Sequence, residues 1–457
     1  MKRRHGLALG LVAAMLTVAG CGGSGGGGGE QSNEQQPAFT KNPNGELKAW
    51  GFDNADDVGK ARLDHAKSAL PDVTITLDAT AFDAQKFTTR LASGDVPDVV
   101  QMDRQLVATY AAQDLIMPLD ECFSAWGVDP EKQFYPAVTA DVRYQDKIWA
   151  VPQFFQPAAV MLNKRVLDKE GVDAAAIDTS KPDQLLATAK KLSTEDGGKP
   201  TRLGFDAVPT GQGPLWLLSY GGRLSDETGK PTLDDPNNAK AIAFLKQLSD
   251  AQGGFAQVKS FSDSFDFFGK NNQFVKDQVA AQVNAQWYVN VLSPYAKSVD
   301  LGAVPFKDQQ GQPFAVTGGT SFVIPAKAKN PDAGCAWMIN LVTDEAWLAA
   351  GQARAATLKK TPGSINTGLF TGSPSADAAI KAKYVTSSGN AGFDQTIQTF
   401  YDVVAHGKSL GASPAGQTIQ SELNNAITSA LLGQKTPEQA LADAQAAAMR
   451  AYQKVAG

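Results

Sequence analysis

Strand patterns and helix patterns alternate between residues 45 and 102, and this order constrains the fold of the chain more than any other feature. Apolar and β-branched runs predict strands over residues 45–52, 73–77 and 97–102. Helical spacing predicts helices over residues 58–70 and 83–92, between those strands. Strands separated by helices of this length are typical of a parallel, doubly wound sheet. We therefore expect an α/β fold.

Three later helices are predicted from their start signals. Asp235 and Asn330 each precede a proline, and an N-cap residue followed by proline favours a helix start. These two helices are expected over residues 236–249 and 331–349. Residues 436–439 read TPEQ, a capping box with proline at the first helical position, which predicts a final helix to about Lys454.

The N-terminus carries the pattern of an export signal. Residues 2–4 are basic, and residues 7–20 form an apolar run. A membrane span needs about 20 apolar residues, so this shorter run indicates a signal peptide over residues 1–20. The run ends LTVAGC, which resembles the bacterial lipobox and implies cleavage before Cys21 and lipidation of that cysteine. The alternative is an ordinary secretory signal with a coincidental cysteine.

The stretch after Cys21 is typical of a tether. Residues 22–29 are glycine except for Ser24, and residues 30–36 are polar. Chains rich in glycine and serine behave as flexible coil. We expect residues 21–38 to hold the folded part of the protein at the cell membrane, on its extracytoplasmic face.

Composition excludes several classes of function. The formal net charge is −5, whereas a nucleic-acid-binding protein needs a basic surface to displace counterions. Three histidines and three cysteines leave little material for a metal centre built from those residues. We therefore expect no nucleic acid, no metal and no cofactor.

Two cysteines remain if Cys21 carries lipid. Cys122 and Cys335 are an even pair in an exported chain, which favours one disulfide. Two buried free thiols, packed as small apolar side chains, are the alternative.

Five stretches, in order along nearly the whole chain, resemble one family. Residues 91–100 read LASGDVPDVV, residues 280–287 read AAQVNAQW, and residues 318–324 read GGTSFVI. Residues 110–119 and the pair 147–152 and 161–164 complete the set. Together they resemble the family 1 extracellular solute-binding proteins of sugar importers, the class that includes maltodextrin-binding protein. Ala285 stands where that family usually has glycine.

The resemblance implies a two-lobed, type II periplasmic-binding-protein fold, with doubly wound sheets joined by hinge strands. Lobe 1 would comprise residues 39–153 and 314–362, and lobe 2 residues 154–313 and 363–457. The chain would cross between lobes near Phe155, Pro313 and Pro362. Cys122 and Cys335 would then share lobe 1, so a bridge between them would leave hinge motion free.

Sugar chemistry selects candidate ligand-binding residues. A pyranose has an apolar face that stacks on aromatic rings and a rim of hydroxyls that hydrogen-bond to planar amide, carboxylate or guanidinium groups. In doubly wound sheets such groups lie at the carboxyl ends of strands. The candidates are Phe52, Asp53, Gln101, Asp103, Gln153, Phe155, Gln156, Gln212, Trp216, Trp287, Tyr288, Gly318, Gly319, Thr320 and Arg354.

Some candidates have structural alternatives. Asp53 could instead cap a helix, Phe155 could pack between the lobes, and Trp287 could serve the core. Trp149 and Trp337 fall among apolar neighbours within regular elements, so we assign both to the core.

The resemblance implies a monomeric, lipid-anchored receptor that closes on a sugar or oligosaccharide and delivers it to the membrane subunits of an ABC permease. We expect a binding protein and not an enzyme. The alternative is an extracellular glycan-active enzyme, which would need two carboxyl groups about 5–9.5 Å apart across a glycosidic bond. A metal or siderophore receptor would need clusters of tyrosine and histidine that the chain lacks.

Overall fold

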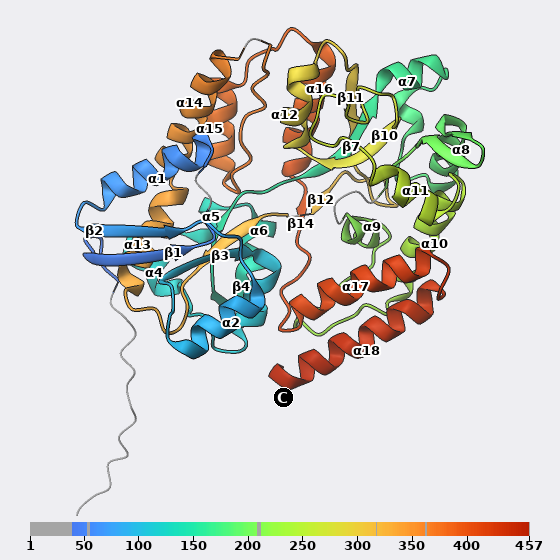
Figure 1. Ribbon diagram of the computed structural model, residues 1–457. Helices are drawn as coiled ribbons and strands as arrows, with labels where there is room; N and C mark the ends of the chain where they lie inside the picture. Colours follow the sequence, from blue (N-terminus) through green and yellow to red (C-terminus); the bar gives the residue numbers. More distant parts are fainter. Residues whose placement is uncertain (1–38, 53–54, 208–211, 317, 362, 457) are drawn as a thin grey trace, which may run out of the picture. The chain divides into compact units, whose positions relative to one another are not determined.

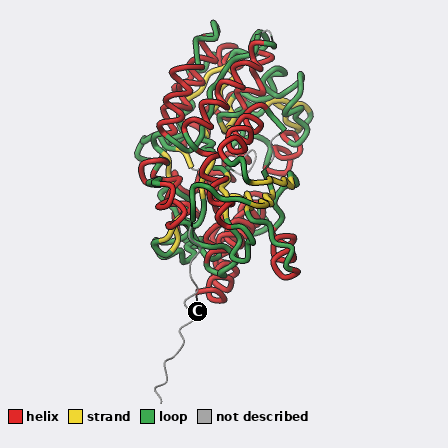
Figure 2. Tube along the Cα trace, turned by 90° about the vertical axis from the view of Figure 1, so that its left-hand side faces the viewer, coloured by secondary structure: helices red, strands yellow, loops and turns green. Residues whose placement is uncertain are grey.

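The fold is described from a computed structural model covering residues 39–52, 55–207, 212–316, 318–361 and 363–456. Residues 38–457 form one compact unit. The expected signal peptide, the lipidation site at Cys21 and the tether lie outside the described residues. Helices and loops enclose the strands of two main sheets (Figures 1 and 2). No described helix is long and apolar enough to cross a membrane.

The first sheet has five strands in the order β2-β1-β3-β13-β6. Its strands are β1 (Gly45–Trp50), β2 (Val73–Asp78), β3 (Val99–Asp103), β6 (Val151–Gln153) and β13 (Thr320–Val323). β1, β2 and β3 are parallel, whereas β13 runs antiparallel between β3 and β6. The predicted α/β class and the strand–helix order of this region are confirmed, and the sheet as a whole is mixed.

Helices α1 (Asp57–Ala69) and α2 (Ala84–Ser93) connect the three parallel strands, as predicted. α13 packs on β1, β3 and β6, and α14 packs on α1. We call this sheet and its helices the first lobe. Its remaining elements are η1 (Arg104–Leu106), α3 (Val107–Ala111), α4 (Asp120–Trp126), α5 (Pro130–Gln133), α6 (Pro136–Val142), β4 (Arg143–Tyr144), β5 (Lys147–Ile148), α13 (Pro331–Val342), α14 (Asp344–Lys359) and α15 (Pro374–Tyr384).

The second sheet has the order β10-β7-β11 and is antiparallel. Its strands are β7 (Ala158–Asn163), β10 (Ala281–Ala285) and β11 (Leu301–Val304). All six residues of β7 are buried, and they alternate between two cores: Ala159 and Met161 belong to one, Val160 and Leu162 to the other. A strand covered on both faces needs such a continuous apolar run.

We call the second sheet and its helices the second lobe. Its helices are α7 (Lys164–Lys169), η2 (Ala174–Ala176), α8 (Pro182–Leu192), α9 (Gly213–Ser219), α10 (Pro236–Asp250), α11 (Phe255–Ser262), α12 (Tyr288–Leu292), η4 (Ser293–Tyr295), α16 (Ala391–Val404), α17 (Gly416–Leu431) and α18 (Pro437–Ala456). Three two-stranded sheets complete the fold in the described part of the chain: β4 with β5, β8 (Thr194–Asp196) with β9 (Lys199–Arg202), and β12 (Ala315–Val316) with β14 (Gly407–Lys408).

The predicted helix starts are confirmed. The Asp235 carboxylate accepts a hydrogen bond from the Asn237 backbone, and Thr436 and Gln439 form the reciprocal bonds of a capping box. The single helix predicted over residues 331–349 is instead two helices. The Thr343 hydroxyl caps α14, so the chain ends α13 there and starts a new helix.

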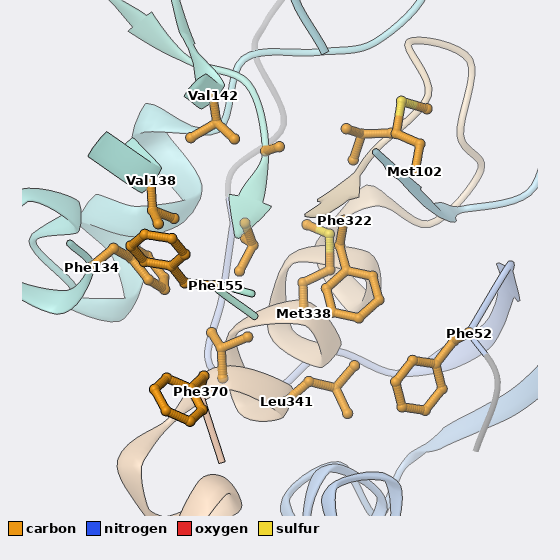
Figure 3. Packing of buried hydrophobic residues seen from close by; sticks show 14 of the residues in the cluster. Phe52, Met102, Phe134, Val138, Val142, Phe155, Phe322, Met338, Leu341 and Phe370 are labelled. Carbon is orange, nitrogen blue, oxygen red and sulfur yellow. The ribbon is translucent and has the colours of Figure 1, made fainter. Parts of the chain in front are cut away.

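Buried aromatic and aliphatic side chains fill the first lobe. Figure 3 shows Phe155 beside Phe134 and Val138, and Phe52 near Phe322 and Met338. All seven phenylalanine and valine residues labelled in that view are at most 3% exposed. Trp149 and Trp337 are also buried, which confirms their assignment to the core.

The chain passes from the first sheet to the second at residues 154–157, between β6 and β7. β12 pairs with β14, and the next strand along the chain, β13, belongs to the first sheet. α15 packs on α14, whereas α16 packs on β7 and β11. We therefore propose that the last crossing lies between α15 and α16, in place of one near Pro362, which is outside the described residues.

Cys122 and Cys335 are joined by a disulfide across 213 residues of sequence. The bond links α4 to α13, both in the first lobe, and both cysteines are fully buried.

Candidate ligand-binding site

A cavity of about 380 Å³ lies between elements of the two lobes. Its volume is in the usual range for small-molecule sites. Gln105 and Gly318 line it from the side of the first sheet, while Trp287 follows β10 of the second sheet. The other lining residues come from the second lobe and its connections: Gln156, Gln212, Pro214, Leu215, Leu224, Ala285, Val316, Leu410, Ile419, Gln420, Leu423 and Asn424.

Trp287 is the aromatic residue of this cavity. It precedes α12 as its N-cap and is partly exposed. Its ring contacts those of Phe267, Phe268 and Tyr288, with centroids 5.8–6.2 Å apart. The indole therefore has a fixed orientation and still offers surface to a ligand.

Five amide side chains share the cavity with Trp287, and none of them hydrogen-bonds to another described residue. They are Gln105, Gln156, Gln212, Gln420 and Asn424. An amide can both donate and accept hydrogen bonds, which suits a ligand rich in hydroxyl groups. Among the described residues that line the cavity there is no Asp, Glu, Lys or Arg, so the site favours an uncharged ligand.

Next to the cavity, Arg104 hydrogen-bonds to the chain on both sides, after β6 and before β13. Its Nη1 donates to the Phe154 carbonyl at 2.7 Å, and its Nη2 donates to the Gly318 carbonyl at 2.9 Å. Gly319 has φ +147°, and a Cβ there would lie 2.5 Å from the Phe154 carbonyl oxygen. Only glycine therefore permits this close approach.

Gln153 is buried beside Arg104 and organises its polar neighbours. Its Nε2 donates to Gln101 Oε1 at 2.5 Å and to Thr320 Oγ1 at 3.1 Å. Gln101 and Thr320 are both partly exposed, so Gln153 acts by positioning them.

Asp103 ends β3 opposite Thr320 and is exposed. Although its side chain reaches solvent, nearby protein atoms remove part of its hydration and raise the pKa of its carboxyl group. The positive charge of Arg104 opposes this rise.

A second cavity, of about 550 Å³, contains Arg354. The guanidinium pairs with Asp57 at 2.8 Å and with Asp56 at 3.1 Å. Partial burial raises the pKa of Asp57, but the hydrogen bond and charge of Arg354 outweigh it and hold that pKa below its ordinary value. Asn290 of α12 also lines this second cavity, whereas Trp287, the N-cap of α12, lines the first.

Residues 67–346 match the model of the bacterial extracellular solute-binding protein family. This chain belongs to that family. The match covers more than half of the sequence, and it confirms the family predicted from the five stretches.

Relatives and solved structures agree with this assignment. An uncharacterized ABC transporter extracellular-binding protein of Pyrococcus horikoshii is 25% identical over 265 residues, 56% of either chain, so the solute-binding protein described here spans little more than half of that relative. CpMnBP1, solved with mannobiose bound, has a TM-score of 0.70 at 21% identity, covering 88% of this chain and 99% of that one. The sugar-binding protein MalE from Xanthomonas citri has a TM-score of 0.67 at 16% identity, covering 90% and 98%. The predicted two-lobed, type II periplasmic-binding-protein fold is confirmed.

Only some of the predicted ligand residues of this solute-binding protein lie together. Gln156, Gln212, Trp287 and Gly318 line the first cavity, and Arg354 lines the second. Gln101, Asp103, Gly319 and Thr320 lie near Gln153 and Arg104 at the sheet edge. Asp53 lies outside the described residues.

Four predicted aromatic ligand residues belong to the core instead. Phe52 packs on Phe322 and Trp337, and Phe155 packs on Tyr135. Figure 3 shows Phe52, Phe322 and Phe155. Their exposed fractions are at most 3%, which leaves no surface for a ligand.

Trp216 and Tyr288 were also predicted to bind the ligand, but both side chains are fully buried. The Trp216 indole donates to the Ala207 carbonyl, and the Tyr288 hydroxyl donates to the Phe267 carbonyl at 2.8 Å. Gln153 is likewise only 1% exposed and does not reach the cavity.

The first turn of α15 contains a buried carboxyl group, that of Asp377. Asp377 accepts hydrogen bonds from the Thr371 backbone and hydroxyl at 2.7 Å and from the Tyr135 hydroxyl at 3.1 Å. Thr371, which lies just before α15, also hydrogen-bonds to the crossing, because its carbonyl accepts from the Phe154 N–H. Burial raises the pKa of Asp377 to about 7, although these hydrogen bonds oppose the rise.

We expect Asp377 to make the stability of this solute-binding protein pH-dependent. Between about pH 4 and pH 7 the folded chain holds a proton that the unfolded chain has released, so stability falls as pH rises. The wild type should lose roughly 1 kcal/mol per pH unit in this window relative to Asp377→Asn. Denaturant unfolding of both proteins at pH 5, 6, 7 and 8 measures this, and parallel stability curves would contradict it.

Proposed function

We propose that this protein is the solute receptor of an ABC importer, and that it binds an uncharged sugar or oligosaccharide in the cavity beside Trp287. One observation carries the proposal. The cavity combines one partly exposed indole with five amide side chains that make no hydrogen bond to another described residue. An indole provides a stacking surface for the apolar face of a pyranose, and the amides can hydrogen-bond to its hydroxyls. Mannobiose in CpMnBP1 and the sugar-binding MalE support a carbohydrate as the ligand.

Binding without catalysis is part of the proposal. A glycosidase needs two carboxyl groups flanking the scissile bond. Among the described residues that line the cavity, none is Asp or Glu. We therefore prefer a receptor to a glycan-active enzyme, and we propose that the bound sugar passes to the membrane subunits of the permease.

A thermal-shift screen of the purified protein against neutral, acidic and amino sugars tests the ligand class. A ligand that binds only the folded state stabilises it by about 2.7 kcal/mol at a hundredfold excess over Kd. A neutral mono- or oligosaccharide should raise the Tm. A response to the acidic or amino sugars alone would overturn the proposal of an uncharged ligand.

We also propose that Cys21 anchors the protein to the extracytoplasmic face of the cell membrane. A single lipid chain binds a membrane marginally and two or more bind stably, so losing the lipidated cysteine should release the protein. We expect Cys21→Ser to appear in the soluble fraction with unchanged sugar affinity, because Cys21 is not part of the compact unit of residues 38–457 that contains the cavity. Cell fractionation in a strain lacking the permease measures this. Retention of the variant in the membrane pellet would refute the anchor.

A further inference from the structure

Phe154, the first residue of the crossing at residues 154–157, has a backbone conformation that its residue type rarely adopts. Its φ is +57°, in the left-handed region that favours glycine. A residue with a side chain keeps such a conformation only where the surrounding structure holds it. Both polar groups of this backbone are held: the N–H donates to the Thr371 carbonyl, and the carbonyl accepts from Arg104 Nη1 at 2.7 Å.

The backbone of Phe154 is connected to the cavity over a short distance. Gln156, two residues later, lines the cavity, and its N–H donates to the Gly318 carbonyl at 3.0 Å. Gly318 lines the cavity as well, and its carbonyl also accepts from Arg104 Nη2. A change in the Phe154 backbone would therefore move an amide side chain and a backbone segment that both face the ligand.

The segment that holds the crossing, residues 370–372, is itself held by Asp377. The carbonyl of residue 370 accepts from the Phe155 N–H at 3.1 Å. Asp377 Oδ1 accepts from both the N–H and the hydroxyl of Thr371 at 2.7 Å, and Oδ2 lies 3.1 Å from the Tyr135 hydroxyl. In its neutral form, Oδ1 still accepts from Thr371 while Oδ2 can donate its proton to the Tyr135 oxygen. The neutral carboxyl group therefore keeps the whole arrangement.

The titratable groups that face Asp377 from neighbouring elements are acids. They are the Tyr135 hydroxyl before α6, the Tyr401 hydroxyl of α16 and the Asp344 carboxyl group at the start of α14. Tyr401 Oη is buried and has no hydrogen-bond partner among the described residues. Burial first, and then the charge of Asp344, raise the pKa of Asp377.

Two cations in the same region serve other partners. Lys381 of α15 donates to Gln398 at 2.9 Å and lies over the Tyr401 ring. Arg62 of α1 lies over the Phe154 ring, 5.5 Å from its centroid, and its Nε donates to the Leu341 carbonyl. Neither forms an ion pair with Asp377, so a negative charge there would be buried without a cation beside it.

We propose that Asp377 is a positioning residue for sugar binding, which holds Phe154 through Thr371, and that sugar affinity falls when Asp377 loses its proton. This inference rests on the proposed sugar-binding function and adds regulation by pH to it. The arrangement that brings Gln156 and Gly318 to the cavity also buries Asp377, and burial favours the neutral carboxyl group. An ionised Asp377 favours arrangements in which water reaches it, and these loosen the segment that holds Phe154. Affinity is therefore highest below the pKa of Asp377 and falls as the pH rises through it.

Calorimetric affinity at pH 5, 6, 7 and 8 tests the inference, with a neutral sugar from the thermal-shift screen, because such a ligand does not titrate. We expect the wild type to bind about fivefold more weakly at pH 8 than at pH 6. Asp377→Asn keeps an acceptor for Thr371 and a donor for Tyr135 without a titrating proton, so its affinity should not change with pH. Tyr135→Phe removes a hydrogen bond that lowers the pKa of Asp377, so its affinity should fall at a higher pH than that of the wild type.

Asp206→Asn is the matched control. Asp206 is another buried carboxyl group, with its pKa raised by burial to about 6, but it lies beside β10 and accepts from Gln282 at 2.8 Å. This variant should keep the fall in affinity that the wild type shows between pH 6 and pH 8.

Three results would overturn the inference and leave the proposed function in place. They are a wild-type affinity that is constant from pH 5 to pH 8, a fall that persists in Asp377→Asn, and a fall that disappears in Asp206→Asn. If Asp377→Asn does not fold, the Tyr135→Phe profile decides, and a fall at the wild-type pH in that variant would overturn the inference. Wild-type protein that binds no carbohydrate at any pH would instead refute the proposed function.

Discussion

Trp287→Ala should weaken binding of the cognate sugar by at least about 2 kcal/mol, roughly thirtyfold in Kd. The change removes the indole from the cavity wall while leaving the five amides in place. The substitution should lower the free energy of unfolding by less than it would at a fully buried tryptophan, because Trp287 is partly exposed without a ligand. Calorimetric affinity and the denaturant midpoint of the unliganded protein measure the two effects. Unchanged affinity in a folded variant would contradict the platform.

Trp216 provides the opposite control. It is fully buried in the second lobe, among Phe205, Phe244 and Phe306. Truncating such a residue to alanine typically costs about 3–5 kcal/mol of stability, so the milder Trp216→Phe is the better variant. It should lower the denaturant midpoint and leave sugar affinity near that of the wild type, the reverse of Trp287→Ala.

Loss of the disulfide should have the largest effect on stability. A bond that closes a loop of 213 residues restricts the unfolded chain, which contributes about 5 kcal/mol in the chain-entropy model. We expect the reduced protein and the double variant Cys122→Ala with Cys335→Ala to unfold at clearly lower denaturant concentration. Sugar affinity should persist, because neither cysteine lines a cavity.

Thiol counting checks the premise of that prediction. Alkylation of denatured but unreduced protein, followed by mass measurement, should leave Cys122 and Cys335 unmodified. Modification of both would show that the exported protein carries two free thiols. Comparing the stability of the wild type with and without reductant then separates the effect of losing the disulfide from the effect of the two alanine substitutions.

Local patterns were sufficient to predict β1, β2 and β3 of the first lobe and the two helices between them, because strand alternation and helix caps are encoded by near neighbours. They could not predict which side chains reach the cavity. Trp287 and Tyr288 are adjacent in sequence, yet one lines the cavity and the other is fully buried. The difference depends on how the end of β10 turns into α12, which single-residue chemistry does not reveal.

Several other site residues were not predicted from the sequence. Arg104 follows Asp103 in an ordinary sequence, and its role depends on carbonyl groups at residues 154 and 318. Gln420 and Asn424 lie four residues apart on α17, so they share a helix face, and that spacing is a signal that could have been noticed. Only the fold brings that face to Trp287.

The place of β13 in the first sheet has a consequence for biogenesis. This strand lies between β3 and β6, although more than 160 residues separate it from either. A chain emerging from a ribosome or translocase therefore cannot complete its first sheet until nearly three-quarters of it has been made or exported. Such late, long-range pairing slows folding. We expect the nascent first lobe to stay incompletely folded until then, which would suit a polypeptide that must be threaded across a membrane before it folds.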